Sequence, residues 1–199
     1  MERIARLKFI DFFFDKLINS TSFNNKLVQI NSNYPNLKQE LFIRNCILEE
    51  FNNNYLCNEF GLRSFAEHPR KNGRTDLCFV DINGSIIKVE LKFQFTKDAN
   101  DLKSYTNVIK KDFETKESDY FILIICDFDI EMKNKFDRKW NLSTSLTKHV
   151  SQSNEWENNI LCCFDSFSAN STLREFNRIV IDKPYPTFYN FYLLKKNFS

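Results

Sequence analysis

Two strand-like runs joined by a tight turn, between Arg74 and Phe95, constrain the fold of this chain more than any other feature. The turn occupies residues 81–84, Asp-Ile-Asn-Gly, which suits a type I turn followed by a glycine in the left-handed conformation. In the second run, polar and apolar residues alternate from Val89 to Phe95, as in a strand with one polar face and one core face. The segment therefore predicts a β-hairpin.

The type of turn decides which side chains face each other across this hairpin. A three-residue loop with a glycine bulge pairs Asp81 with Ser85. Counting back along both runs then places Asp76 directly opposite Glu90, with Cβ atoms about 4.5–5.5 Å apart. A two-residue loop ending at Gly84 would instead put these two carboxylates on opposite faces. We expect the bulged turn, because Asp and Asn occupy positions that a type I turn accepts well.

Two carboxylates directly opposite each other destabilise a sheet unless a cation lies between them. Lys92 and Gln94 share the face of Glu90, and Gln94 could support a site there. A divalent cation held by carboxylates from both strands, beside a lysine that reaches a water or a phosphate, is an arrangement that can hydrolyse a phosphodiester. The simpler alternative is a solvated strand face on which Lys92 neutralises Glu90.

These residues resemble a known family, the PD-(D/E)XK nucleases of the restriction-endonuclease-like superfamily. In that family a helix with a glutamate precedes a strand, the next strand carries Asp, the following one carries Glu-x-Lys, and a helix and another strand come after. The resemblance covers residues 36–129, and its motifs here are Gln39-Glu40-Leu41-Phe42-Ile43-Arg44-Asn45, Arg74-Thr75-Asp76-Leu77 and Val89-Glu90-Leu91-Lys92. Thr75 stands where the family's proline would be, and this departure leaves Asp76 in place.

The resemblance implies an α/β fold with a restriction-endonuclease-like core, that is, a central mixed β-sheet flanked by helices. It implies that Asp76 and Glu90 bind a metal ion and that Lys92 orients or activates the attacking water. It also implies that Glu40 approaches the metal from the preceding helix.

The helix position of Glu40 leaves a second interpretation open. Glu40 and Arg44 are spaced to form an i, i+4 ion pair, which would give Glu40 a structural role. The same helix also carries Glu49 and Glu50, so the pattern alone does not fix which glutamate faces the site. A structural pair and a metal ligand both remain compatible with the sequence.

Length and composition describe a folded globular chain. Its 199 residues are 42% hydrophobic and include 22 phenylalanines, which suits one domain with an ample core. Only three glycines and four prolines occur, so extended linkers are not expected. We divide the chain into an N-terminal helix and loop (1–35), a nuclease-like core (36–129) and a C-terminal extension of the same domain (130–199).

Cysteines and the N-terminus predict a cytoplasmic protein. The six cysteines form no Cys-x-x-Cys motif, and several lie in apolar runs, so we expect buried free thiols, with the adjacent pair packed on a strand: Cys46, Cys57, Cys78, Cys126, Cys162 and Cys163. The first residues are too charged for a secretory signal. No apolar run approaches the ~18 residues of a membrane span, so no membrane association is expected.

The net charge of +2 does not by itself indicate a nucleic-acid partner, so basic residues must act locally. Arg70, Lys71 and Arg74 lie just before Asp76, in an expected loop where they could hold phosphates. Lys103 and Lys110 lie on the helix expected after the hairpin and could steady a phosphate in the same way. An ordinary solvated loop and a solvated helix face are the alternatives.

Periodicity sets the remaining elements. Helices are expected over residues 4–17, 36–53 and 98–115, with a loop over 24–35. The strand before the hairpin is expected in residues 55–60 or 63–67. A continuous apolar run predicts a central strand covered on both sides, and two further strands are expected, the last of them rich in aromatic residues that suit a core, a dimer surface or base stacking: residues 120–126, 159–164 and 187–194.

Missing motifs exclude other chemistries. The only histidines are His68 and His149, so HNH-type and paired-histidine ribonuclease chemistry lack parts, and the chain has no glycine-rich phosphate-binding loop. Metal-assisted hydrolysis remains, with Asp76, Glu90 and the backbone carbonyl of Leu91 holding one or two Mg²⁺ or Mn²⁺ ions. The sequence therefore favours a metal-dependent nuclease, and most of all a DNA endonuclease of restriction, defence or repair.

Two alternatives stay open. One is a nucleic-acid-binding or assembly subunit that keeps the fold without cleaving, and the other is a ribonuclease toxin with the same metal site. An enzyme that cuts both strands of DNA would be expected to act as a homodimer.

Overall fold

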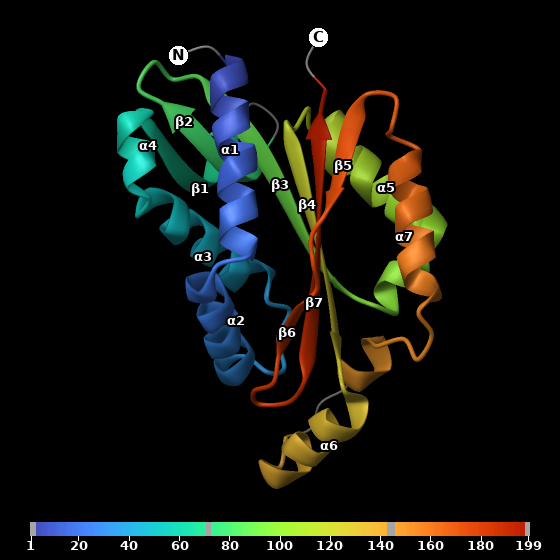
Figure 1. Cartoon of the computed structure of the whole chain (residues 1–199). Helices are drawn as coiled ribbons and strands as arrows, with labels where there is room; N and C mark the ends of the chain where they lie inside the picture. The colour runs from blue at the N-terminus through green and yellow to red at the C-terminus, as the bar shows by residue number, and fades with distance from the viewer. Residues whose placement is uncertain (1–2, 71–72, 143–145, 198–199) are drawn as a thin grey trace.

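The computed structural model describes residues 3–70, 73–142 and 146–197, which contain seven α-helices and seven strands (Figure 1). The helices are α1 (Arg3–Ile18), α2 (Thr21–Asn33), α3 (Glu40–Asn52), α4 (Tyr55–Glu59), α5 (Leu102–Ile109), α6 (Ile130–Lys139) and α7 (Glu155–Asp165). The strands are β1 (Leu62–Arg70), β2 (Gly73–Asp81), β3 (Ile86–Phe95), β4 (Tyr120–Phe128), β5 (Ser171–Glu175), β6 (Ile179–Ile181) and β7 (Thr187–Lys196). Short helical turns are η1 (Asp98–Asn100), η2 (Lys110–Thr115) and η3 (Leu146–His149).

All seven strands form one mixed sheet. Its order is β1-β2-β3-β4-β7-β5, and β6 also pairs with β7. Strands β3 and β4 are parallel, and the other neighbours are antiparallel. The predicted α/β class, with a central mixed sheet flanked by helices, is confirmed. Residues 130–199 supply three strands of this same sheet.

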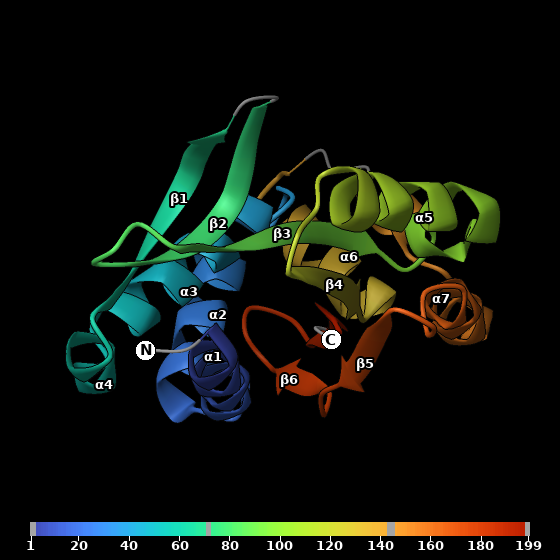
Figure 2. The same cartoon turned by 90° about the horizontal axis from the view of Figure 1, so that it is seen from above.

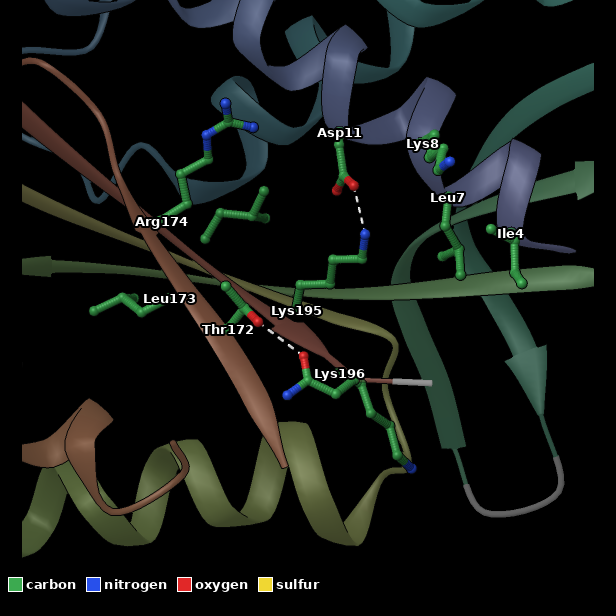
Figure 3. Close-up of a pocket in the computed structure, with 11 residues that line it drawn as sticks. Ile4, Leu7, Lys8, Asp11, Thr172, Leu173, Arg174, Lys195 and Lys196 are labelled. Carbon is green, nitrogen blue, oxygen red and sulfur yellow. Dashed lines mark hydrogen bonds and ion pairs between the residues drawn. The ribbon is translucent and has the colours of Figure 1, made fainter. Parts of the chain in front are cut away.

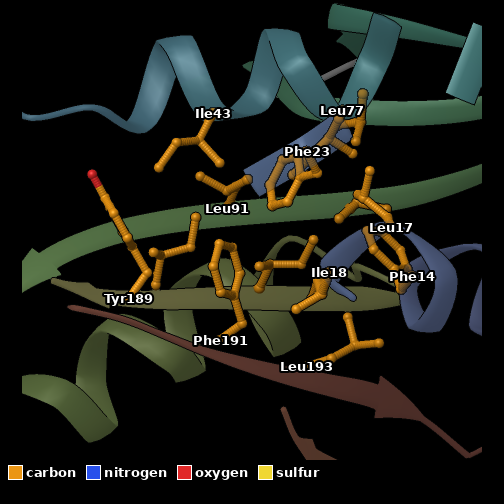
Figure 4. Packing of buried hydrophobic residues seen from close by; sticks show 14 of the residues in the cluster. Phe14, Leu17, Ile18, Phe23, Ile43, Leu77, Leu91, Tyr189, Phe191 and Leu193 are labelled. Carbon is orange, nitrogen blue, oxygen red and sulfur yellow. The ribbon is translucent and has the colours of Figure 1, made fainter. Parts of the chain in front are cut away.

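Strand β4 divides the core into two hydrophobic clusters. Tyr120, Ile122 and Ile124 lie in the larger one, with α1, α2 and α3 (Figure 4). Phe121 and Leu123 lie in the other, with α5 and α7. Successive side chains of a strand point to opposite faces, so a continuous apolar run fits a strand covered on both sides. The prediction of a central strand over residues 120–126 is confirmed.

The turn between β2 and β3 has the predicted conformation. The Asp81 amide donates to the Ser85 carbonyl at 3.1 Å, and the Gly84 amide donates to the Asp81 carbonyl at 2.9 Å. Gly84 has φ +78°, the left-handed conformation that glycine adopts most easily. Pairing then runs from Val80↔Ile86 to Leu77↔Val89, so the bulged register is confirmed.

The expected loop over residues 24–35 is wrong, because α2 spans most of it. The Ser20 hydroxyl caps this helix by accepting from the Phe23 amide at 3.1 Å. Phe23, Leu27 and Ile30 recur at helical spacing and are buried. Three apolar residues among many asparagines made a stripe too sparse to predict the helix.

The expected strand over residues 159–164 is also wrong, because these residues belong to α7. Trp156, Ile160 and Cys163 lie one turn apart along that helix and are buried, whereas Cys162 is exposed. The adjacent cysteines therefore do not pack on a strand. A short apolar run fits a strand or a buried helix equally well, and only Trp156, outside the run, shows the helical period.

The other elements match more closely. Helices α1 and α3 and strand β7 are confirmed within a few residues. The strand before the hairpin is β1, as in the 63–67 alternative, while 55–60 forms α4. The expected helix over 98–115 consists of η1, α5 and the π-helical η2. All six cysteines are free thiols, four of them buried.

Within the described ranges, no helix is both long enough and apolar enough to cross a membrane. Tyr189, Phe191 and Tyr192, in the aromatic run of β7, are buried and belong to the core.

Candidate active site

The candidate site lies where β2 and β3 separate. They pair as far as Leu77↔Val89, after which β2 continues with β1 to Gly73 and β3 continues with β4 to Phe95. Figure 2 shows β1 and β2 rising away from β3. We call this opening the fork. Asp76 is the first residue of β2 past the last pair, and the confirmed register places it opposite Glu90.

The separation leaves backbone groups of β3 without strand partners, and two carboxylates bind them. In this register the N–H and C=O groups of residues 91 and 93 point toward β2. The Leu91 amide donates to Asp76 Oδ2 at 2.9 Å, and the Phe93 amide donates to Glu40 Oε2 at 2.8 Å. Side chains thus replace the missing ladder bonds, which fixes both carboxylates at the fork.

The Leu91 carbonyl points into the same opening, because the N–H and C=O groups of one strand residue share a direction. The fork therefore gathers carboxylate oxygens and a carbonyl oxygen. These hard oxygen donors are the kind that Mg²⁺ and Mn²⁺ prefer.

Glu40 lies at the first position of α3 and reaches the fork from the helix. Burial raises the pKa of Glu40, and the charge of Asp76 adds to the rise, while the Phe93 amide and the Lys92 ammonium oppose it. These influences place Asp76 and Lys92 within electrostatic reach of Glu40. The alternative pair with Arg44 does not form, because Arg44 binds Glu67. Glu49 and Glu50 do not compete for this position, since both bind Lys26 of α2.

Glu90 is the most deeply buried of the predicted residues, with a side chain 0% exposed. The Lys116 ammonium lies 2.5 Å from Glu90 Oε2 and 2.7 Å from Asp112 Oδ1. Sequence reasoning missed Lys116. The only sequence signal for it is the i, i+4 spacing with Asp112, which gives no indication of a contact with β3.

Lys92 and Gln94 are half-buried on the face that Glu90 shares. The Lys38 ammonium, just before α3, donates to Gln94 Oε1 at 3.1 Å and lies 3.9 Å from Asp98. Lys38 was also missed, and no spacing in the sequence points to it. The fork thus brings together Glu40, Asp76 and Lys92. Lys38 lies at its edge, where its ammonium donates to Gln94.

Among the described residues, no three His, Cys, Asp or Glu side chains gather closely enough to form a ready metal cluster. Any cation at the fork would therefore depend on the Leu91 carbonyl and on water in addition to carboxylates. Mg²⁺ commonly keeps several waters and binds through one or two carboxylates, so the donor set fits it.

The basic residues predicted to hold phosphates lie in several surroundings. The loop expected around Arg70 and Arg74 is wrong for both, because Arg70 ends β1 and Arg74 lies in β2, where it pairs with Pro69. Arg74 is exposed and lies 4.0 Å from Glu67. Lys103 and Lys110 are exposed, at the start and just past the end of α5. Arg70 ends β1, but its side chain and the whole of Lys71 lie outside the described residues.

A separate cavity of about 630 Å³ lies between α1 and the β5–β7 edge of the sheet (Figure 3). Its walls combine apolar side chains such as Leu7 and Leu193 with cations. Lys195 pairs with Asp11, and Arg174 lies 2.6 Å from Asp15, so two of the four cations that line the cavity have acidic partners. In the sheet, β4 lies between this edge and the fork.

Comparisons of the chain with protein-family models, with curated proteins and with solved structures find no match.

Proposed function

We propose that this protein is a nuclease that hydrolyses phosphodiester bonds at the fork with a divalent cation, Mg²⁺ or Mn²⁺. The observation that carries the proposal is the set of carboxylates at the fork: Asp76 and Glu40 are anchored by backbone amides of β3, within electrostatic reach of Lys92. A catalytic metal site needs oxygen donors that hold their positions, and these hydrogen bonds supply that rigidity.

The proposed roles follow from position. Asp76 and the Leu91 carbonyl would bind the cation, with Glu90 and Glu40 as further ligands, directly or through water. A cation bound there supplies Lewis acidity toward a phosphate oxygen and lowers the pKa of a bound water. Lys92 would orient that water and counter the negative charge that develops on the phosphate. Gln94 would hold Lys38 beside the site.

The order of the elements supports the finer assignment to a restriction-endonuclease-like core. A helix with Glu40 (α3) is followed by β1, by β2 with Asp76 and by β3 with Glu90-x-Lys92, and then by α5 and β4. This is the order that the resemblance to the PD-(D/E)XK family implies. We propose DNA as the substrate, with Arg74, Lys103 and Lys110 as phosphate contacts outside the fork.

The test is cleavage of supercoiled plasmid and of a single-stranded RNA by the intact chain in Mg²⁺, Mn²⁺ or EDTA. The key variant is Asp76→Asn, and its matched control is Asp11→Asn, the same change in the cavity. We expect metal-dependent nicking or linearisation that Asp76→Asn lowers at least about a thousandfold, equal to about 4 kcal/mol of barrier. Asp11→Asn should cleave like the wild type. Cleavage that persists in EDTA or in Asp76→Asn would contradict the proposal.

Two observations favour a second candidate, the subunit that binds nucleic acid without cleaving it. The Lys116 ammonium forms an ion pair with Glu90, and the described residues contain no group of three metal-ligand side chains. The same assay separates the candidates. DNA retarded on a gel but never cut supports the binding subunit, whereas cleavage of RNA in preference to plasmid supports the ribonuclease alternative.

A further inference from the structure

The contact between Lys116 and Glu90 joins the fork to the segment that precedes β4. A fully buried carboxylate is costly unless a cation lies beside it, and here the Lys116 ammonium supplies that charge. A divalent cation on Glu90 would satisfy the same carboxylate. Two cations beside one buried carboxylate repel each other, so binding of one opposes binding of the other.

The backbone before β4 places Lys116 where it reaches Glu90. Residues 110–115 form the π-helical turn η2, and the Lys116 amide donates to the Lys111 carbonyl, five residues back, at 3.2 Å. π-Helical turns are rare and occur often at functional sites. A second bond that spans five residues follows, from the Ser118 amide to the Phe113 carbonyl at 2.9 Å. Strand β4 then begins at Tyr120, and Phe121 pairs with Glu90.

Asp112 gives the ammonium a second partner. The side chains of Glu90, Asp112 and Lys116 are 0%, 14% and 27% exposed, so Asp112 is the more exposed of the two carboxylates that Lys116 binds. Lys116 binds both carboxylates at once. It could therefore leave Glu90 and keep Asp112 with only a small movement of a flexible side chain.

We propose, on the basis of the proposed function, that Lys116 is the counter-ion of Glu90 in the metal-free protein. A divalent cation would displace the Lys116 ammonium from Glu90, and the ammonium would keep its contact with Asp112. We call this arrangement the latch. The latch keeps a buried carboxylate neutralised in the metal-free protein. It also lowers metal affinity, because the incoming cation must break the Lys116–Glu90 contact. By linkage, whatever strengthens that contact weakens metal binding by the same factor.

The latch predicts opposite effects for two substitutions. Lys116→Gln removes the competing cation, so Mn²⁺ should bind at least about fivefold more tightly than to the wild type. Asp112→Asn removes the partner that receives the displaced ammonium, so Mn²⁺ should bind more weakly. We would measure both by titration calorimetry of the intact chain without nucleic acid, with Asp76→Asn as the control that assigns the binding to the fork.

The outcomes distinguish failure of the latch from failure of the metal site. Tighter binding to Lys116→Gln supports the latch, whereas equal or weaker binding overturns it and leaves the nuclease proposal standing. If neither the wild type nor Lys116→Gln binds Mn²⁺, or if Asp76→Asn binds as well as the wild type, the metal site itself is wrong and the latch falls with it. If circular dichroism shows Lys116→Gln to be unfolded, Asp112→Asn decides alone: weaker binding supports the latch and unchanged or tighter binding overturns it.

Discussion

The fork between β2 and β3 and the cavity between α1 and β5 hold charged side chains in different states. In the cavity, two of the four lining cations, Lys195 and Arg174, each pair with an aspartate. At the fork, Asp76 and Glu40 accept from uncharged backbone amides, whereas Glu90 pairs with the Lys116 ammonium. Salt bridges neutralise two cations of the cavity, whereas uncharged amides hold two carboxylates of the fork in place. The comparison teaches that the partner of a charged side chain, a salt bridge or a backbone amide, is the feature to test at a candidate site.

The largest difference in cleavage rate is expected when one lysine in each region is substituted by methionine. Lys92→Met removes the group proposed to orient water, and cleavage should fall about a hundredfold or more. Lys195→Met is its matched control in the cavity, where a partly exposed pair with Asp11 and a cation–π contact with Tyr120 are lost. We expect wild-type cleavage rates from the control in the plasmid assay. Equal losses in the two variants would mean that the fork has no special role.

We expect nucleic acid to bind at the basic residues of α5 and just past its end, and not at the cavity. Lys103→Ala and Lys110→Ala should each lower the slope of log Kobs against log salt concentration by about 1, because each removes one phosphate contact. Lys8→Ala, in the wall of the cavity, should leave the slope unchanged. Fluorescence anisotropy of labelled duplex DNA in EDTA measures these slopes. The reverse pattern would move the nucleic-acid surface to the cavity.

A change in the turn tests how the fork is positioned. Gly84→Ala should destabilise the protein by about 1–2 kcal/mol, because φ +78° is unfavourable for alanine. No atom lies within 4 Å of an added Cβ, so backbone strain and not a clash would cause the loss. Gly84→Asn should cost less, since Asn tolerates this conformation. Thermal unfolding distinguishes them, and equal melting temperatures for Gly84→Ala and the wild type would contradict the bulged turn.

The smallest effect concerns the protonation of Glu40. Burial raises the pKa of Glu40 above 4.5, so the folded state binds this proton more tightly than the unfolded state does. The stability that this group contributes is therefore lost as the pH rises from 4.5 through the raised pKa of the folded state. Above the raised pKa, the cost of burying the charged carboxylate is complete. Glu40→Gln removes the penalty, so its melting temperature relative to the wild type should be more favourable at about pH 7.5 than at about pH 4.

The cavity offers a control for this pH effect. Asp11→Asn removes the partner of Lys195, so no gain in stability is expected from it at about pH 7.5. If the melting temperatures of Glu40→Gln and the wild type differ by the same amount at both pH values, ionisation of Glu40 does not cost stability in the folded protein.

Local sequence signals predicted the hairpin because its information is local. The turn residues set the register, and the register alone places Asp76 opposite Glu90. Likewise, the run from Tyr120 to Cys126 is apolar on both faces, and it forms the strand between the two clusters. Where a short stretch of sequence determined the outcome, the prediction held.

Interactions between distant segments could not be predicted in this way. Lys116 and Glu90 are 26 residues apart, and their contact depends on the parallel pairing of β3 with β4 and on the π-helical turn before it. Lys38 reaches Gln94 across 56 residues. No periodicity carries such information, because the spacing is set by tertiary packing.

The most direct test of the fork as a metal site is an anomalous diffraction map from crystals grown with Mn²⁺. The account predicts the strongest peak between the Asp76 carboxylate and the Leu91 carbonyl, with none at the Asp11 carboxylate in the cavity. A strongest peak outside the fork, or no peak beside Asp76 at saturating Mn²⁺, would contradict it.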